Sequence, residues 1–247
     1  MQWDATNARP SDDFLKFTTW PVESHWTNFL AKNDSLQPQA TQAWINYLDK
    51  VQATPGLYLA RNTEQLHSQW LYKKYASINR LEEGKYLIDN TNMPDIVYEN
   101  KLLGNLVFIV NTGQGEKISH ASLDGSPLLL RYKSHGKSFL YLPPLGKKQY
   151  ILEIKTGPGL PEVYIDYIGT YNIYNTKLSP DNLEFDIKMY GSQKIDIHCP
   201  LPDTVISNNP FLEITDYYYN VNDGILTITL SGRDMQGESG RVIVGRF

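Results

Sequence analysis

The fold is decided by a stretch in the middle of the chain, ISHASLDGSPLLLRYKSHGKSFLYL at residues 118–142. Short runs of apolar and aromatic residues alternate here with turn residues. Asp124-Gly125 between two such runs is a strong β-hairpin signal, because both residues tolerate the left-handed backbone of a two-residue hairpin turn. A second turn is expected at residues 134–137. The stretch therefore predicts consecutive antiparallel strands.

The same two-residue period extends from Gly84 to the C-terminus. We expect one set of strands within residues 83–158 and a second set within residues 159–247, because a Gly-Pro-Gly turn at residues 157–159 separates them. Each set has enough strands for one antiparallel β-sandwich, and a single large sandwich is the alternative.

Residues 1–82 follow a different pattern, in which short apolar runs alternate with helical periodicity. Strands are predicted at residues 14–19 and 57–60, and helices are predicted at residues 38–53 and from Asn62 or Thr63 onward. The second helix is expected to bury a stripe made of Leu66, Trp70, Leu71, Tyr75 and Ile78. Such a β-α-β-α segment is incomplete, because two parallel strands leave both faces of a sheet uncovered. The chain is therefore predicted to be mainly β with an N-terminal α/β segment.

Composition and charge exclude several classes of function. The net charge is −4 and there is no run of basic residues, so nucleic acid is not an expected partner. No apolar run is long enough to span a membrane, and the polar N-terminus does not resemble a signal peptide. Aromatic residues make up 12% of the chain, which suits β structure and also suits sugar-binding surfaces. We expect an extracellular, periplasmic or cell-surface location.

The sequence contains no recognisable metal or cofactor motif. None of its five histidines lies within four residues of another, so the spacings typical of zinc sites are missing. A nucleophile elbow and a phosphate-binding loop are missing too. The single cysteine, Cys199, ends an alternating stretch and is expected to be a small buried side chain. We therefore expect neither a metal nor a cofactor.

Residues 20–26 form the best local candidate for a site. Trp20 and Trp26 have indole rings that can stack on sugars. Glu23 and His25 between them are candidates for a pair that handles a proton in catalysis. The alternative is that the two tryptophans fill a domain interface and that His25 makes an ordinary hydrogen bond.

A second candidate is the run Tyr217-Tyr218-Tyr219. Because side chains alternate along a strand, Tyr218 must lie on one face while Tyr217 and Tyr219 lie on the other. We assign Tyr217 and Tyr219 as candidate carbohydrate-binding residues, since exposed rings on a sandwich make flat platforms for sugars. Core packing beside a solvent-facing edge is the alternative.

Several stretches resemble known carbohydrate-active proteins. AWINYL at residues 43–48 and GLYLARNTEQL at residues 56–66 resemble the end of the barrel in polysaccharide deacetylase-like proteins. LDGSP at residues 123–127 and LPPLGKKQYILEI at residues 142–154 resemble the β-sandwiches that follow catalytic domains in many carbohydrate-active enzymes. The resemblance implies a divalent metal held by an Asp-Asp motif early in the barrel and by a pair of histidines. Here Asp12-Asp13 lies in a predicted loop before the strand that begins at Phe14, and no two histidines have the spacing of such a pair.

The combined expectation is a non-catalytic accessory or truncated part of a polysaccharide-processing protein. Its partner would be a polysaccharide or oligosaccharide, and it would pack against an upstream domain or another chain. Two alternatives are a sugar-directed hydrolase or esterase with a dispersed site, and a structural protein whose sheet is completed by a partner.

Overall fold

The computed structural model describes residues 30–54, 60, 62–112, 117–157, 163–167, 171–232 and 237–245. Strands make up 51% of these residues and helices 19%, so the chain is mainly β with helices at its N-terminal end, as the sequence predicted. The predicted strand at residues 14–19 lies outside the described residues, and so do residues 57–59 of the next predicted strand.

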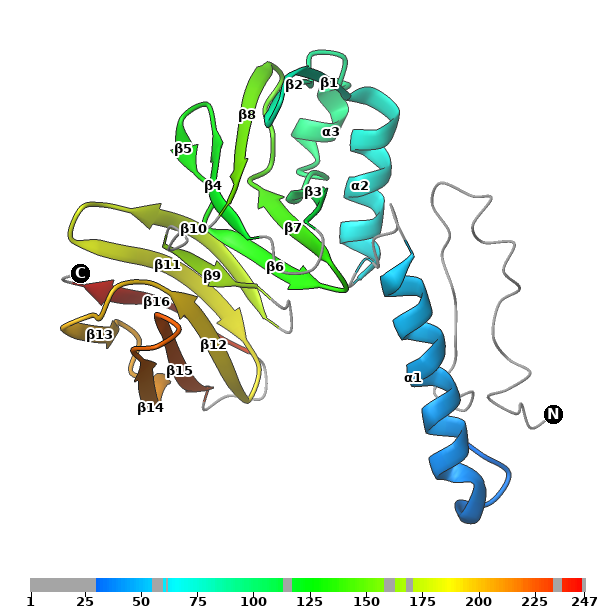
Figure 1. Cartoon of the computed structure of the whole chain (residues 1–247), viewed down its shortest axis with the longest axis vertical. Coiled ribbons are helices and arrows are strands. Elements are labelled where there is room, and N and C mark those ends of the chain that lie inside the picture. The colour runs from blue at the N-terminus through cyan, green and yellow to red at the C-terminus, as the bar shows by residue number, and fades with distance from the viewer. Residues whose placement is uncertain are drawn as a thin grey trace.

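Helix α1 (Gln37–Ala53) confirms the first predicted helix and follows a short 3-10 helix, η3 (Asp34–Leu36). A proline lies in its first turn, where the missing N–H costs no helical hydrogen bond. Ala40 and Trp44 are buried, and Tyr47 packs beside them. Figure 1 shows α1 extending away from the sheets, and its buried side chains belong to neither sheet core.

Helix α2 (Thr63–Tyr75) begins where the sequence predicted, with the Asn62 side chain accepting a hydrogen bond from the backbone N–H of Gln65 at 2.8 Å. Its buried face is Ser68, Leu71 and Tyr72. The predicted apolar stripe was wrong in part: Trp70 is 39% exposed, and Ile78 lies in a strand. The helix ends at Tyr75 because the next residue has an extended backbone, so helical spacing does not continue to residue 78.

A five-stranded sheet follows the helices. In spatial order its strands are β1 (Ser77–Glu82), β2 (Lys85–Asp89), β8 (Gln149–Thr156), β4 (Ile118–Leu123) and β5 (Ser126–Pro127). The turn at Asp124 and Gly125 joins β4 to β5 with φ of 48° and 77°, which confirms the predicted hairpin.

A seven-stranded sheet is the centre of the molecule. In spatial order its strands are β14 (Leu212–Asn220), β15 (Ile225–Gly232), β12 (Ser192–His198), β9 (Tyr164–Asp166), β6 (Leu130–Ser134), β7 (Lys137–Leu142) and β3 (Leu106–Asn111). All its pairs are antiparallel except β6 with β9, which is parallel. That one pair joins strands from the two predicted sandwich segments, so the segments share a sheet.

The third sheet has four strands. In spatial order they are β10 (Asn172–Leu178), β11 (Asn182–Met189), β16 (Glu238–Gly245) and β13 (Thr204–Ser207). Alternate residues of β11 are fully or nearly fully buried, which is the pattern of a strand with one face on a core and the other toward solvent.

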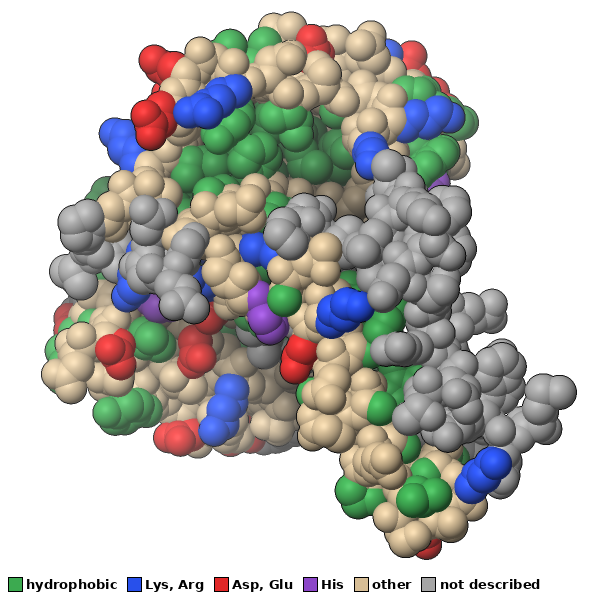
Figure 2. Space-filling model, turned by 45° about the vertical axis from the view of Figure 1, so that its right-hand side comes forward, with side chains coloured by type: hydrophobic (Ala, Val, Ile, Leu, Met, Phe, Trp, Pro, Cys, Tyr) green, Lys and Arg blue, Asp and Glu red, His purple; other side chains and the backbone are tan. Residues whose placement is uncertain are grey.

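The central sheet takes part in two hydrophobic cores. On one face, Leu140 and Leu142 of β7 pack with Leu152 of the five-stranded sheet, and α2 and the short helix α3 (Asp95–Glu99) close this first core. On the other face, Ile195 and Ile228 pack with residues of the four-stranded sheet in a second core. In the upper part of Figure 2, a hollow lined by hydrophobic side chains opens over the first of these cores.

The beginning of the β3 edge of the central sheet is covered by a side chain of α2. The Gln69 amide group donates to the carbonyl of Asn105 at 2.6 Å and accepts from the N–H of Val107 at 3.1 Å. These are the groups with which another strand would pair, so Gln69 substitutes for a neighbouring strand. The opposite edge, β14, has no such closure among the described residues.

Candidate functional site

The residues predicted from the sequence fall into two groups. Trp20, Glu23, His25 and Trp26 lie outside the described residues, so their roles stay predictions. The tyrosine run lies on β14, at the edge of the central sheet, with Tyr217 60% and Tyr218 65% exposed.

The three tyrosines do not face the same way. Tyr217 and Tyr219 are in register with Ile228 and Leu226, whose side chains lie in the second core. Tyr219 packs against that core, and its hydroxyl donates to the carbonyl of Cys199 at 2.9 Å. Tyr218 therefore lies on the opposite face, which is the face not covered by the four-stranded sheet.

On that face, strand register aligns Tyr218 with a row of polar side chains. Tyr218 is opposite Thr227 on β15, Thr227 is opposite Asp196 on β12, and Asp196 is opposite Asp166 on β9. The parallel pair then places Arg131 of β6 beside Asp166. We call these five residues the cross-strand row. Their neighbours along each strand lie in the second core, so the row lies on the opposite face of the sheet. This face is exposed at Tyr218 and Asp196, where we call it the outer face, and it is covered by the first core at Arg131, whose register partner is Leu140.

The two carboxylates of the row are close neighbours without a cation between them. The Thr227 hydroxyl donates to Asp196 at 2.6 Å. Burial, with a smaller contribution from the charge of Asp196, raises the pKa of Asp166 to about 6. Arg131 is buried, but its guanidinium donates to the carbonyl of Leu128 at 3.0 Å and lies 4.9 Å from the ring centre of Tyr164.

A stacked pair of rings lies beside the row. His198 and Tyr164 are in register on β12 and β9, with ring centres 4.1 Å apart and planes only 12° from parallel. Burial, with smaller contributions from the positive charges of Lys117 and Arg131, lowers the pKa of His198 to about 4. The imidazole is therefore neutral near pH 7, and one ring nitrogen can accept a hydrogen bond while the other donates.

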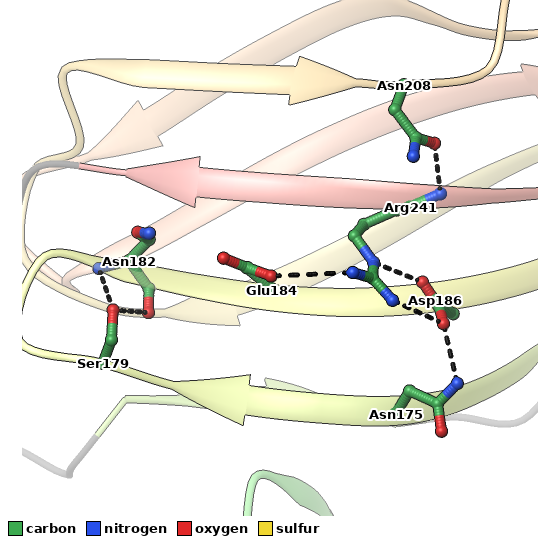
Figure 3. Close-up of polar contacts among 7 residues, drawn as sticks. All are labelled: Asn175, Ser179, Asn182, Glu184, Asp186, Asn208 and Arg241. Atoms are coloured by element: carbon green, nitrogen blue, oxygen red, sulfur yellow. Dashed lines mark hydrogen bonds and ion pairs between the residues drawn. The ribbon is translucent and has the colours of Figure 1, made fainter.

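Asp186 of the four-stranded sheet, unlike the carboxylates of the cross-strand row, is paired with an arginine. There the Arg241 guanidinium donates to both oxygens of Asp186, at 2.7 and 3.1 Å, and the Asn175 amide donates to the same carboxylate at 2.8 Å (Figure 3). These contacts, the Arg241 hydrogen bond foremost, lower the pKa of Asp186. Its hydrogen-bonding capacity is used within the protein, so this group holds strands together. In the cross-strand row, Asp166 and Asp196 form no ion pair with another described residue.

Within the described ranges, no group of three or more His, Cys, Asp or Glu side chains is arranged to hold a metal ion. In the same ranges, no helix is both long and apolar enough to cross a bilayer.

Sequence reasoning missed most of the row. The alternation of Ile195, Asp196, Ile197 and His198 predicted a strand with two polar side chains on one face. It could not show that Asp166 would lie beside Asp196, because that depends on the pairing of β9 with β12.

Comparisons with protein-family models, with curated proteins and with solved structures find no match for the chain.

Proposed function

We propose that the chain binds a glycan on the outer face of the seven-stranded sheet, as a non-catalytic accessory part of a polysaccharide-processing protein. The observation that supports this is the register that aligns the exposed ring of Tyr218 with Thr227, Asp196 and Asp166. An aromatic ring offers a flat apolar surface to the C–H face of a sugar. Carboxylates without ion pairs accept hydrogen bonds from sugar hydroxyls.

The proposal assigns the residues different tasks. Tyr218 supplies the stacking surface, and Asp196, two strands away beyond Thr227, supplies an acceptor. Neutral His198 offers both a donor and an acceptor to a hydroxyl further along the sheet. Tyr217 remains a candidate contact at the strand edge, whereas the hydroxyl of Tyr219 is bonded to the protein itself. Tryptophans 20 and 26 remain a second predicted platform.

Electrophoresis through native gels that contain dissolved neutral polysaccharide tests this function. The wild-type protein should be retarded by at least one of xylan, mixed-linkage glucan or a soluble chitin derivative. Tyr218→Ala should abolish the retardation, because it removes the stacking surface. Tyr174→Ala is the matched control, since Tyr174 is a 43% exposed tyrosine on β10 of the other sheet. Migration that is unchanged in every gel would contradict the proposal.

One observation favours a second function, a sugar-directed hydrolase. Asp166, whose pKa is raised to about 6, lies beside a second carboxylate, and glycosidases use one carboxylic acid with a raised pKa as the proton donor of such a pair. In this version Asp166 would donate a proton to the departing sugar oxygen. Release of reducing ends from oligosaccharides, lost in Asp166→Asn, would support it, and retardation without release supports the binding function alone.

A further inference from the structure

The edge of β14 is an open site for pairing with another strand. β14 pairs only with β15, and it is the longest strand among the described residues. Its sequence contains no lysine, arginine or proline, which are the residues that usually protect such edges. Its one register shift, between Ile214 and Asp216, leaves residues 216–220 as a regular edge.

The other end of the same sheet shows how this protein closes an edge. At β3, the Gln69 side chain occupies the backbone groups that a strand would use. The two-residue β5 and the four-residue β13 are too short to guide an added strand. The other two edge strands, β1 and β10, each contain a basic residue (Arg80 and Lys177) and a register shift. Among the described strands, β14 is therefore the edge best suited to accept one.

The side chains of β14 determine which residue types an added strand would need on each of its faces. Glu213, Asp216 and Tyr218 are in register with Ser231, Thr229 and Thr227 on the outer face. Ile214 and Tyr217 lie on the core face, where Tyr217 is 60% exposed at the open end of the second core. A strand added here would place alternate residues next to carboxylates and a tyrosine ring, and the intervening residues next to apolar side chains.

We propose that β14 binds an extended segment of a partner protein in which basic residues alternate with apolar ones. Lysine or arginine on the outer face would lie opposite Asp216 and could contact the face of the Tyr218 ring. Apolar side chains on the other face would cover Tyr217 and extend the second core. The affinity would come from backbone hydrogen bonds, and the alternating pattern would give the specificity.

A second copy of this chain fits the edge less well. If two β14 strands paired, Asp216 of both chains would lie on the same face of the joined sheet. Like charges on neighbouring strands destabilise a sheet. The partner is therefore a different, basic segment.

The test uses fluorescence anisotropy with a labelled, capped nine-residue peptide that alternates lysine with valine and threonine. The full chain should bind this peptide. It should bind the peptide in which glutamate replaces lysine about tenfold more weakly. Two further peptides carry N-methyl groups on alternate residues, so that each can pair through only one of its edges. One of them should bind and the other should not, because only one edge faces β14.

Variants of the protein locate the binding site. Asp216→Lys should lower the affinity for the lysine peptide and raise the affinity for the glutamate peptide. Asp203→Lys, at an exposed position outside β14, should change neither affinity. Failure of the lysine peptide to bind overturns the proposal, and so does equal binding of both N-methylated peptides. A dimer of the chain that Asp216→Lys strengthens or disrupts, seen by sedimentation, would show that a second copy is the occupant instead.

Discussion

Replacing Asp166 by asparagine is expected to stabilise the fold at neutral and alkaline pH but not in acid. In the folded chain the pKa of Asp166 is raised from its ordinary value of 3.8 to about 6, chiefly by burial. If counted in full, this difference corresponds to about 3 kcal/mol between the folded and unfolded states. Asp166 is only partly buried, so screening by water reduces the expected effect to about 1.5 kcal/mol.

The sign follows from which state holds the proton more tightly. Because the folded pKa is raised, folding favours protonated Asp166. The contribution of this group to stability is fully present below pH 3.8 and is lost as the pH rises through about 6. Above that pH the folded wild-type protein contains a partly buried charge next to Asp196. Asparagine has a similar shape and no charge, so the variant avoids this loss.

Urea unfolding of both proteins at a series of pH values from about 4 to about 8 measures the difference. The advantage of Asp166→Asn should be near zero at the acid end and grow to about 1.5 kcal/mol above pH 7. Asp216→Asn, an exposed carboxylate on the same face, controls for the removal of one negative charge. A difference that is constant across the series, or largest in acid, would refute the electrostatic reasoning.

His198 titrates in an overlapping range with the opposite sign. Its folded pKa is lowered to about 4 from 6.5, so its contribution to stability is present above pH 6.5 and is lost as the pH falls toward 4. The pH dependence of wild-type stability therefore combines the opposite contributions of Asp166 and His198. The comparison of Asp166→Asn with wild type removes the part that comes from His198, because both proteins contain it.

Three further predictions concern the frame that supports the site. Gly84→Ala should destabilise the fold by about 3 kcal/mol or more in thermal melts, since Gly84 has φ of +70° and an added Cβ would meet a backbone carbonyl of β8. Gly125 has φ of +77° but open space around it, so Gly125→Ala should destabilise the fold by only about 1 kcal/mol in the same melts. Gln69→Ala should lower the free energy of unfolding by about 2 kcal/mol in urea, because it leaves the backbone groups of Asn105 and Val107 without partners. Lys73→Ala, on the exposed side of α2, should leave the free energy of unfolding unchanged. Burial raises the pKa of Cys199 to about 12, so the folded protein should react with a thiol reagent roughly a hundredfold more slowly than the unfolded chain; equal rates would contradict this.

The sequence predicted the elements of this fold better than their arrangement. The Asp124-Gly125 turn located the hairpin of β4 and β5, and helical spacing located α1, because each signal lies within one turn or one element. Strand β1 was missed, because Ile78 continued the spacing of the second predicted helix. β1 is a sheet edge whose residues are all exposed, so it lacks the alternation of a strand with one buried face.

The central sheet could not be predicted for a different reason. It depends on the parallel pairing of β6 with β9, which joins residues 130–131 to residues 165–166. Nothing in either strand specifies that partner, since both are short and both bury apolar residues. The composition of the candidate site follows from this one pairing, because it brings Arg131 into the row that contains Asp166.

The direction of the tyrosines depends on a single extra residue in β14. Counting alternate residues from buried Leu212 through Ile214 would place Tyr218 on the core face and leave Tyr217 and Tyr219 outside. The register shift between Ile214 and Asp216 adds one residue, Thr215, and reverses this order. The sequence does contain a signal for the shift, because two polar residues in succession separate Ile214 from Tyr217 where strict alternation allows one. The bulge thus places Tyr218 on the face that carries the carboxylates of β12 and β9, and without it Tyr217 and Tyr219 would lie on that face instead.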